Sequence, residues 1–398
     1  IRIGGFMQVK QKWTNVSIIT PTGPVLKDLV MEDDRISALL DPASPTGTDW
    51  RIIDGAGQII FPGMIDLLQH GFDVNFYHEP TPGCVADSSA LLPAHGVTGF
   101  LPTIGSLAPE KMASVISDLA GQCGQANGAR ALGVHSEGPC FGAPGAHNPE
   151  NLRLPTLNLA HEIIDAADGH LLAVTVAPEL EGAEAFIRLM KQAGVSVHLG
   201  HSCALADDIS RYVSWGIDAV THMYNVTASL PPDGSGVHQF SLPDALIAES
   251  GLPLGIICDG IHVHPKLVKL LAQLPSDRVF LETDSIKFAG REGARFEAYP
   301  GYWLTSEKGK AVKDDKGGLC GSSLTSHEAM LNFLTFSGAG LTRAAIASAL
   351  IPARVLGLEG DMGSVETGKL ADFSLLDPST FAVNATYVGG KQVYERKP

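Results

Sequence analysis

Short, almost uninterrupted apolar runs recur along the middle of the chain, and longer segments with helical spacing separate many of them. The runs are IIFPGMIDLL (59–68), TGFLPT (98–103), ALGVHSE (131–137), LLAVTVAPE (171–179), VSVHLGH (195–201), DAVTHMYN (218–225), PLGIICDG (253–260) and RVFLETD (278–284). The helical segments include GAEAFIRLMKQAG (182–194) and HPKLVKLLAQL (264–274). Apolar strands that alternate with helices are typical of a parallel sheet buried on both faces. About eight such strands predict an α/β fold, a closed (β/α)8 TIM-like barrel.

The two ends of the chain have a different pattern, with short β-rich segments broken by turns. They are WTNVSIITPTGPVLKDLVMEDDRISALL (13–40) and GKLADFSLLDPSTFAVNATYVGGKQVYE (368–395), and the latter ends in a predicted hairpin at VGGKQVYE. We therefore expect residues 1–60 and 357–398 to form one small accessory β-sandwich, and residues 61–356 to form the barrel. An open doubly wound sheet is the structural alternative. It is less favoured because polar residues end nearly every strand instead of gathering at one switch point.

Polar residues of catalytic type close five of the apolar runs: Glu137, His201, His222, His262 and Asp284. In a barrel, the carboxyl ends of the strands converge on one site. Any one of these histidines alone could be a hydrogen-bonded structural residue. Two histidines and a carboxylate together suit zinc, which can activate a water molecule, and a carboxylate off the metal can accept the proton of that water. Asp284 is placed for that role, the alternative being a cap on the next helix.

Composition limits the partners of the chain. Its 398 residues include 43 acidic and 28 basic ones, for a net charge of −15. This charge disfavours nucleic acid and anionic membrane surfaces as partners, and it leaves open a local basic pocket for a small anionic substrate. The six cysteines form no CxxC pair, so we expect reduced thiols in a cytoplasmic protein. No apolar run is long enough to span a bilayer.

A family resemblance rests on ordered blocks over nearly the whole chain. They are FPGMID (61–66), HSEGPCFGAPGAHNPENLR (135–153), VSVHLGHS (195–202), THMYN (221–225), CDGIHV (258–263), LETDS (281–285), GSSLTS (321–326) and PARVLGLEGDMGSVETGKLADFSLLD (352–377). These blocks resemble the N-acetylglucosamine-6-phosphate deacetylases of the amidohydrolase superfamily. The resemblance implies a metal-dependent hydrolase that removes the N-acetyl group from an amino sugar, most simply N-acetylglucosamine-6-phosphate, and releases acetate.

Two other functions stay open. One keeps the chemistry but acts on an unphosphorylated N-acetyl amino sugar or on an N-acyl amino acid. The other is a non-catalytic scaffold of the same fold, which the joint presence of the candidate ligands and Asp284 argues against.

The resemblance also implies a metal site. Glu137, His201 and His222 match the ligands of a single divalent ion, for which zinc is the expected metal. Some relatives carry a His-x-His pair in the first barrel strand, but here Leu68 replaces its first histidine and His70 keeps the second. His70 leaves a weak second metal open. Strand alternation should turn Gln69 away from the site.

The substrate contacts implied by the resemblance come from several loops. His147 matches a catalytic residue that holds the substrate and polarises its amide. Asn225, the backbone at Val226 and His262 match contacts to the sugar or its phosphate, and residues 319–322, which include Ser322, match a loop over the acetyl group. The family tends to form homodimers, so a homodimer is expected.

The chain departs from the family at one position. An arginine that contacts the substrate phosphate is usual eight residues beyond Asn225, where this chain has Asp233. A carboxylate repels phosphate and cannot replace a guanidinium group. Lys287, Arg291 and His238 are candidate substitutes, and each could equally be a solvated surface residue.

Overall fold

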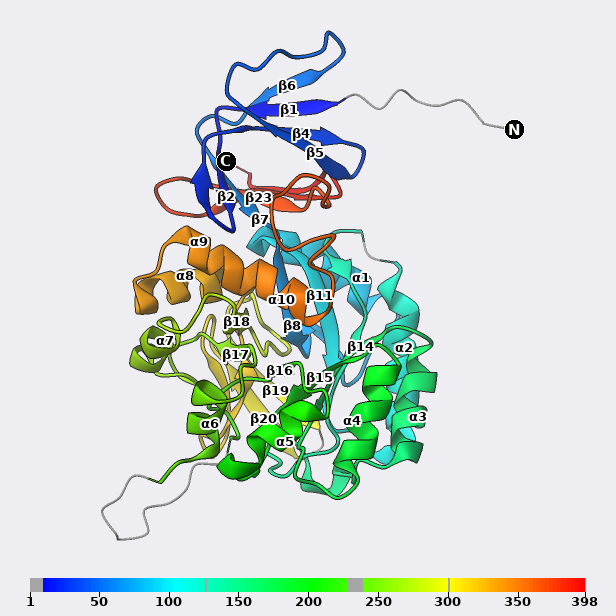
Figure 1. Cartoon of the computed structure of the whole chain (residues 1–398). Coiled ribbons are helices and arrows are strands. Elements are labelled where there is room, and N and C mark those ends of the chain that lie inside the picture. Colours follow the sequence, from blue (N-terminus) through cyan, green and yellow to red (C-terminus); the bar gives the residue numbers. More distant parts are fainter. Residues whose placement is uncertain (1–9, 126, 228–238, 300, 398) are drawn as a thin grey trace.

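The protein is represented by a computed structural model that describes residues 10–125, 127–227, 239–299 and 301–397. Figure 1 shows a barrel surrounded by helices and, above it, a smaller all-β unit that contains both the first and the last described strands, β1 (Gln11–Thr14) and β25 (Lys391–Glu395). Among the described residues, no helix combines the length and the apolar character needed to cross a membrane.

The barrel is built from parallel strands. They are β8 (Met64–Gln69), β11 (Val97–Ile104), β12 (Arg130–Ala131), β13 (Val134–Glu137), β14 (Leu171–Val176), β15 (Ser196–Leu199), β16 (Ala219–Val220), β17 (Leu254–Ile257) and β18 (Val279–Glu282). Strands β12 and β13 both pair with β11 and occupy one position, so the strands fill eight positions. A parallel bridge between Gln69 and Ser285 links the two edges. The predicted fold class is confirmed.

Helices cover the outside of the barrel because each buries one apolar stripe. They are α1 (Cys84–Leu91), α2 (Pro109–Cys123), α3 (Leu157–Ala167), α4 (Ala183–Gln192), α5 (Ile209–Ser214), α6 (Leu242–Ala248), α7 (Pro265–Leu271), α8 (Ser326–Ser337), α9 (Leu341–Ala345) and α10 (Ile351–Val355). Short 3-10 helices are η1 (Leu92–His95), η2 (Pro149–Asn151) and η3 (Ala206–Asp208), and a π-helix, η4 (Ile346–Leu350), joins α9 to α10. In α4, Phe186, Ile187 and Met190 are buried at helical spacing. Helices α4 and α7 lie where the spacing predicts them.

The accessory unit consists of two sheets that draw on both ends of the chain. One sheet has the order β5 (Arg35–Leu40), β4 (Asp28–Glu32), β1 (Gln11–Thr14), β6 (Arg51–Asp54). The other has the order β25 (Lys391–Glu395), β24 (Val383–Val388), β23 (Phe373–Leu376), β7 (Ile59–Pro62), β2 (Ser17–Thr20), β3 (Gly23–Val25). Trp13, Phe373 and Tyr387 pack in their shared core. The two-residue Gly389–Gly390 turn joins β24 to β25, with both φ angles positive, as the predicted hairpin requires. The exact domain boundaries stay a prediction.

The apolar run at 59–68 serves both units instead of forming one strand. It ends in the sandwich as β7 and starts again in the barrel as β8, with Gly63 between them. The Gly63 amide donates to the Asp372 carbonyl at 3.0 Å. A Cβ at Gly63 would lie 2.1 Å from Oγ1 of Thr98, so a side chain at this junction would collide with β11.

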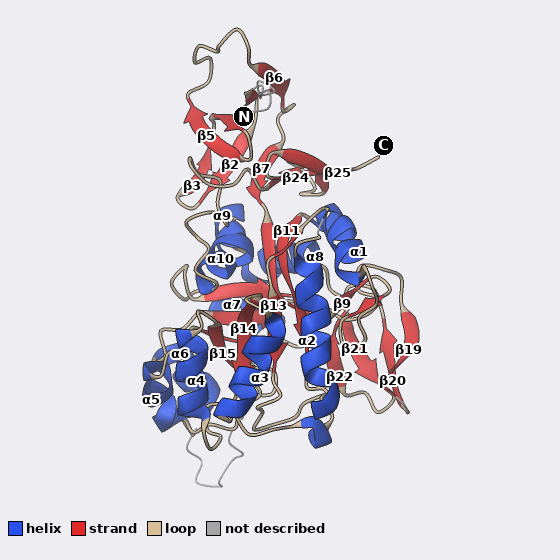
Figure 2. Cartoon of the chain, turned by 90° about the vertical axis from the view of Figure 1, so that its right-hand side faces the viewer, coloured by secondary structure: helices blue, strands red, loops and turns tan. Residues whose placement is uncertain are grey.

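A further antiparallel sheet was not predicted. It consists of β19 (Ala294–Tyr299), β20 (Tyr302–Ser306), β21 (Ala311–Asp314) and β22 (Leu319–Ser322), inserted between β18 and α8. Figure 2 shows it beside the barrel, near the hairpin strand β9 (Gly71–Phe72), which pairs with β10 (Asn75–Phe76). Phe296, Leu304 and Val312 form its own small core. This sheet places residues 319–321 at the carboxyl end of the barrel.

Candidate active site

A cavity of about 430 Å³ opens at the carboxyl ends of the barrel strands. The predicted residues that line it are Glu137, His147, His201, His222, Asn225, Val226 and Asp284, and His70 lines it as well. His262 and Ser322 are not among its lining residues. The barrel therefore brings most of the predicted site together, although these residues lie on separate strands and loops.

Glu137 stands at the centre of the site, at the end of β13. Its Oε1 lies 2.8 Å from Nε2 of His222 and 3.2 Å from Nε2 of His201, and the two Nε2 atoms are 3.1 Å apart. All three side chains are almost completely buried. Three ligand-type atoms therefore form a compact triangle, as expected for one face of a divalent metal site.

The proton on His201 can be assigned from its second nitrogen. Nδ1 of His201 lies 3.0 Å from the carbonyl of Ala143, which can only accept a hydrogen bond. Nδ1 therefore carries the proton of the neutral ring, and Nε2 points its lone pair at Glu137 and His222. Lone pairs that converge in a buried site repel one another unless a proton or a metal cation lies between them. This arrangement fits a metal ligand.

Backbone strain accompanies these side chains. His201, His222 and Asp284 have φ angles of 50°, 29° and 48°, in the left-handed region that residues other than glycine seldom adopt. Such strain persists only where the surrounding structure enforces it, and it gathers at functional sites. Here it turns the three side chains into the cavity directly after their strands end.

The hydrogen bonds around Glu137 shift its protonation and that of its partners. Burial alone would raise the pKa of Glu137, but hydrogen bonds from His147, His201, His222 and His70 hold that pKa well below its usual value. Burial alone would lower the pKa of His222, but the hydrogen bond and charge of Glu137 outweigh it and raise the pKa to about 9. Glu137 is therefore an anion at neutral pH, as a ligand must be, whereas His222 carries a proton that a bound metal ion would displace.

His147 also contacts the Glu137 carboxylate, but its neutral ring carries the proton on Nε2, whereas that of His201 carries it on Nδ1. Its Nδ1 accepts the backbone amide of Ser106 at 3.2 Å, so Nε2 carries the proton of the neutral ring. Nε2 lies 3.3 Å from Oε2 of Glu137. Ligand-type atoms of Glu137, His147 and His201 lie within 4.8 Å of one another. The protonated Nε2 nevertheless suits His147 to hydrogen-bond donation, and His222 is the better third ligand.

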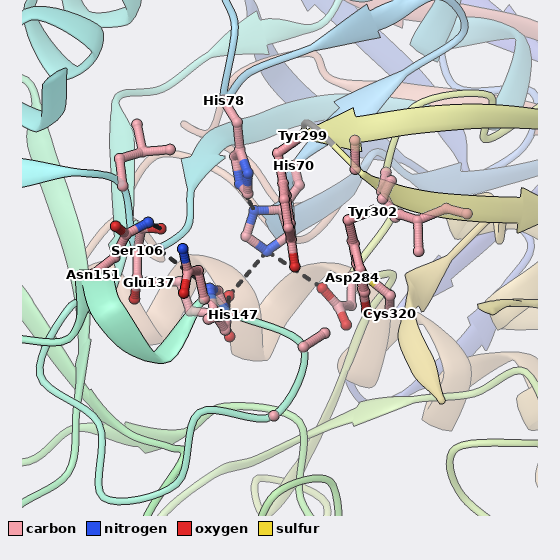
Figure 3. Close-up of a pocket in the computed structure, with 18 of the residues that line it drawn as sticks. His70, His78, Ser106, Glu137, His147, Asn151, Asp284, Tyr299, Tyr302 and Cys320 are labelled. Atoms are coloured by element: carbon pink, nitrogen blue, oxygen red, sulfur yellow. Dashed lines mark hydrogen bonds and ion pairs between the residues drawn. The ribbon is translucent and has the colours of Figure 1, made fainter. Parts of the chain in front are cut away.

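His70 lies between the two carboxylates of the site, as Figure 3 shows. Its Nε2 is 3.0 Å from Oε2 of Glu137 and 3.4 Å from Oδ1 of Asp284. Burial would lower the pKa of His70, but hydrogen bonds to Asp284 and Glu137 raise it to about 10. A protonated His70 can therefore bridge Glu137 and Asp284. Gln69 points away and accepts a hydrogen bond from Tyr77, as strand alternation predicts.

One residue of the site that contacts His70, His78, was not predicted from the sequence. Nδ1 of His70 lies 3.1 Å from Nε2 of His78, and that Nε2 accepts the Gly105 amide at 2.8 Å. His78 also lines the cavity. Only its closeness in sequence to His70 could have suggested this contact, because the β9–β10 hairpin is what folds it back.

Two residues predicted to contact the substrate, His262 and Ser322, do not line the cavity. The His262 ring is buried, with Nδ1 2.7 Å from Asp259, and its Nε2 has no partner among the described residues. The Ser322 hydroxyl donates to the Thr283 carbonyl and accepts the Leu324 amide, so it supports the loop and does not face the cavity. The substrate roles of both residues stay predictions.

The candidate substitutes for the missing arginine do not gather at the cavity. Arg291 pairs with Asp73 at 3.0 Å, and the Lys287 ammonium group lies 5.6 Å from the centre of the Phe288 ring. Neither is a lining residue, whereas Lys111, in the first turn of α2, is. Asp233 and His238 lie outside the described residues.

Comparison with known proteins agrees with this site. A sequence model of the Amidohydrolase family matches residues 166–393. N-acetylglucosamine-6-phosphate deacetylase from Rattus norvegicus is 31% identical over 96% of this chain and 95% of the relative. N-acetylgalactosamine-6-phosphate deacetylase from Escherichia coli O157:H7 is 32% identical over 86% of this chain and 89% of the relative.

Solved structures show the same likeness. The crystal structure of N-acetylglucosamine-6-phosphate deacetylase from Pasteurella multocida has a TM-score of 0.87 at 26% identity, covering 96% of this chain and 99% of that one. A mutant of the Mycobacterium smegmatis deacetylase in complex with N-acetyl-D-glucosamine-6-phosphate has a TM-score of 0.85 at 25% identity, covering 97% and 99% of the two chains. From its barrel, its site and these matches, the chain belongs to the amidohydrolase family, in the group of the N-acetylglucosamine-6-phosphate deacetylases.

Proposed function

We propose that this protein removes the N-acetyl group of N-acetylglucosamine-6-phosphate, giving acetate and glucosamine-6-phosphate. The observation that carries the proposal is the convergence of Glu137, His201 and His222 beside Asp284 in one cavity. The names of the most similar relatives support the substrate class. Backbone strain gathers at functional sites, so this buried and strained group of residues argues against a non-catalytic scaffold.

Glu137, His201 and His222 would hold one divalent ion, and zinc is the expected metal because imidazole and carboxylate are its usual ligands. A bound ion would supply a water molecule of lowered pKa and would polarise the acetyl carbonyl. Leu68 offers no ligand atom, so we expect about one tightly held ion per chain. Elemental analysis that consistently finds two tightly held ions would contradict this count.

The protein side chains would move the protons of the reaction. His147 lines the cavity with Nε2 3.3 Å from Oε2 of Glu137, and Nε2–H would donate to the acetyl oxygen as negative charge develops there. Asp284 would accept the proton of the attacking water and pass it to the amide nitrogen as the C–N bond breaks. His70 would hold the Asp284 carboxylate in place for both transfers.

Asn225 and Val226 would bind the substrate from the loop after β16. Both line the cavity, and Val226 has a φ angle of 47°, which turns its backbone out of the regular path. That loop enters the site opposite Ser106 and Lys111, which follow β11. The sugar would therefore lie between the two loops.

An unphosphorylated N-acetyl amino sugar is the second candidate. It is favoured because neither Lys287 nor Arg291 lines the cavity. Among the described lining residues, Lys111 is the one lysine or arginine, and its side chain is exposed.

The test compares acetate release from N-acetylglucosamine-6-phosphate, its galactosamine epimer, both unphosphorylated sugars and a set of N-acetyl amino acids, with the metal content measured on the same preparation. Preference for a phosphorylated sugar supports the proposal. Equal kcat/KM for phosphorylated and plain sugars would favour the second candidate. An N-acyl amino acid preferred over every sugar would overturn both.

A further inference from the structure

The inserted sheet gives the cavity an apolar wall. Of the residues that line the cavity, six pack with one another in the core of the β19–β22 sheet: Phe76, Ile286, Ala298, Tyr302, Leu304 and Cys320. Tyr299 adds to this wall and stacks on Tyr302, with ring centres 4.5 Å apart and planes 6° apart. An apolar surface of this extent can bury the methylene groups of an alkyl chain.

A second wall of the cavity is polar. The segments that follow β11 and β13 supply Ser106, Lys111, Asn148 and Asn151. In Figure 3, Ser106 and Asn151 lie on the His147 side of the site, whereas Tyr299, Tyr302 and Cys320 lie on the Asp284 side. The hydroxyl groups of a sugar suit the polar wall, so the acyl group of the substrate would face the apolar wall.

The apolar wall begins beside the proposed base. Gly321 has a φ angle of 60°, and a Cβ there would lie 2.7 Å from the Asp284 carbonyl oxygen, 2.7 Å from Cγ2 of Ile286 and 3.6 Å from Oδ1 of Asp284. Glycine is required for both the backbone angle and the space. No side chain therefore separates the Asp284 carboxylate from the wall, and an acyl chain could pass from the reacting carbonyl along it.

We propose that this wall is an acyl-chain pocket, and that the enzyme hydrolyses N-acyl amino sugars with chains longer than acetyl. The proposal rests on the proposed function and deepens it. The reaction is the same hydrolysis: the amide C–N bond breaks, the water oxygen bonds to the acyl carbon, and a longer carboxylic acid leaves. Each methylene that leaves water for the wall is worth roughly fourfold in binding.

Ala298 offers a way to fill the pocket. It lies on β19, is 8% exposed and lines the cavity. Ala298→Leu would add side-chain carbons where the acyl chain should lie. Thr305→Leu is the matched control, because Thr305 is exposed on the outward face of β20, where side chains alternate with those of the core.

The experiment measures kcat/KM of the metal-loaded enzyme for N-acetyl-, N-propionyl-, N-butyryl- and N-hexanoylglucosamine-6-phosphate. We expect the butyryl substrate to be cleaved as well as the acetyl one or better, and a drop of more than tenfold would overturn the proposal. Ala298→Leu should lower the hexanoyl-to-acetyl ratio at least tenfold, and Thr305→Leu should change it less than twofold.

Other outcomes separate the two proposals. An Ala298→Leu protein that folds and keeps the original ratio would also overturn the acyl pocket. If that variant does not fold, the substrate series on the unmodified enzyme decides. Failure to cleave the acetyl substrate itself would instead overturn the proposed function.

Discussion

Two pairs of histidines lie in the same barrel, one deeper than the other. In the upper pair, the Nε2 atoms of His201 and His222 are 3.1 Å apart and face Glu137. In the lower pair, His135 bonds the Leu67 carbonyl and Oγ1 of Thr175, and the ring centres of His135 and His198 are 5.4 Å apart. The lower rings bond backbone and hydroxyl groups, and no carboxylate contact of theirs is found among the described residues.

Height along the strand separates the two pairs. His135 and Glu137 are two residues apart on β13, so both point to the same face, and the layers of a barrel interior follow this spacing. His198 lies inside β15, whereas His201 follows it, where the backbone takes a positive φ. A histidine inside a strand fills the core, and a histidine just past the strand end reaches the cavity. Residue type alone does not decide the role.

The largest effect is expected at the upper pair. His201→Ala should lose the bound divalent ion, because one of the three proposed ligand atoms is removed. Activity should fall by roughly 10³-fold or more. Elemental analysis and acetate release would measure the two losses, and circular dichroism should show an unchanged fold. Retention of a stoichiometric ion with near-normal turnover would remove His201 from the ligand set.

Asp284→Asn should come next. The amide has nearly the same size but cannot accept the proton of water, so kcat should fall by roughly 10²–10⁴-fold. Metal content should be unchanged, which distinguishes this variant from His201→Ala. Turnover within a few-fold of the parent enzyme would exclude Asp284 as the base.

The sequence alone could predict the strands of the barrel and most of the site. Continuous apolar runs leave few alternatives for a parallel sheet, and the ends of its strands must converge, so Glu137, His201, His222, His262 and Asp284 could be grouped without coordinates. Of these five, His262 does not line the cavity. The choice of Glu137, His201 and His222 as metal ligands came from the family resemblance. The resemblance added His147, which no strand end marks.

Other features depend on backbone paths that the apolar pattern does not encode. The orientation of the Ser322 hydroxyl is set by its bonds to Thr283 and Leu324, and the return of His78 to His70 is set by a short hairpin. The β19–β22 sheet did carry a signal, since Phe296, Ala298 and Leu304 alternate with exposed residues. That alternation is a weaker signal than the continuous apolar runs of the barrel strands.

Cationic side chains should also differ in their effect on activity according to whether they line the cavity. Lys111 lines the cavity and lies at the N-terminus of α2, where the helix dipole also favours an anion, so Lys111→Ala should lower the preference for a phosphorylated sugar by roughly three- to tenfold. Arg291 is paired with Asp73, and Arg291→Ala should leave the preference unchanged. The measurement is the ratio of kcat/KM for phosphorylated and plain substrates. The reverse order of effects would place the phosphate on the side of Arg291.

The smallest effect on activity is expected at the lower pair. His135→Gln should keep the ion and should keep turnover within about threefold, because His135 bonds Leu67 and Thr175 and none of the proposed ligands. Stability at neutral pH should fall by about 1–2 kcal/mol, since one of these buried hydrogen bonds is lost or distorted. Metal analysis and thermal unfolding would measure both, and loss of the ion would mean that the lower pair positions the upper one.

The stability of the parent protein and that of His135→Gln should depend differently on pH. Burial lowers the pKa of His135 to about 4 from its usual 6.5. Between these values the unfolded chain binds a proton that the folded chain does not, so His135 should cost roughly 1.4 kcal/mol of stability for each pH unit that the pH falls below 6.5. His135→Gln removes this titration, and its Tm should therefore fall less steeply than that of the parent between pH 6.5 and 4. Parallel Tm curves for the two proteins would show that His135 is already protonated in the fold, and the interior of the barrel would then be more polar than its hydrogen bonds indicate.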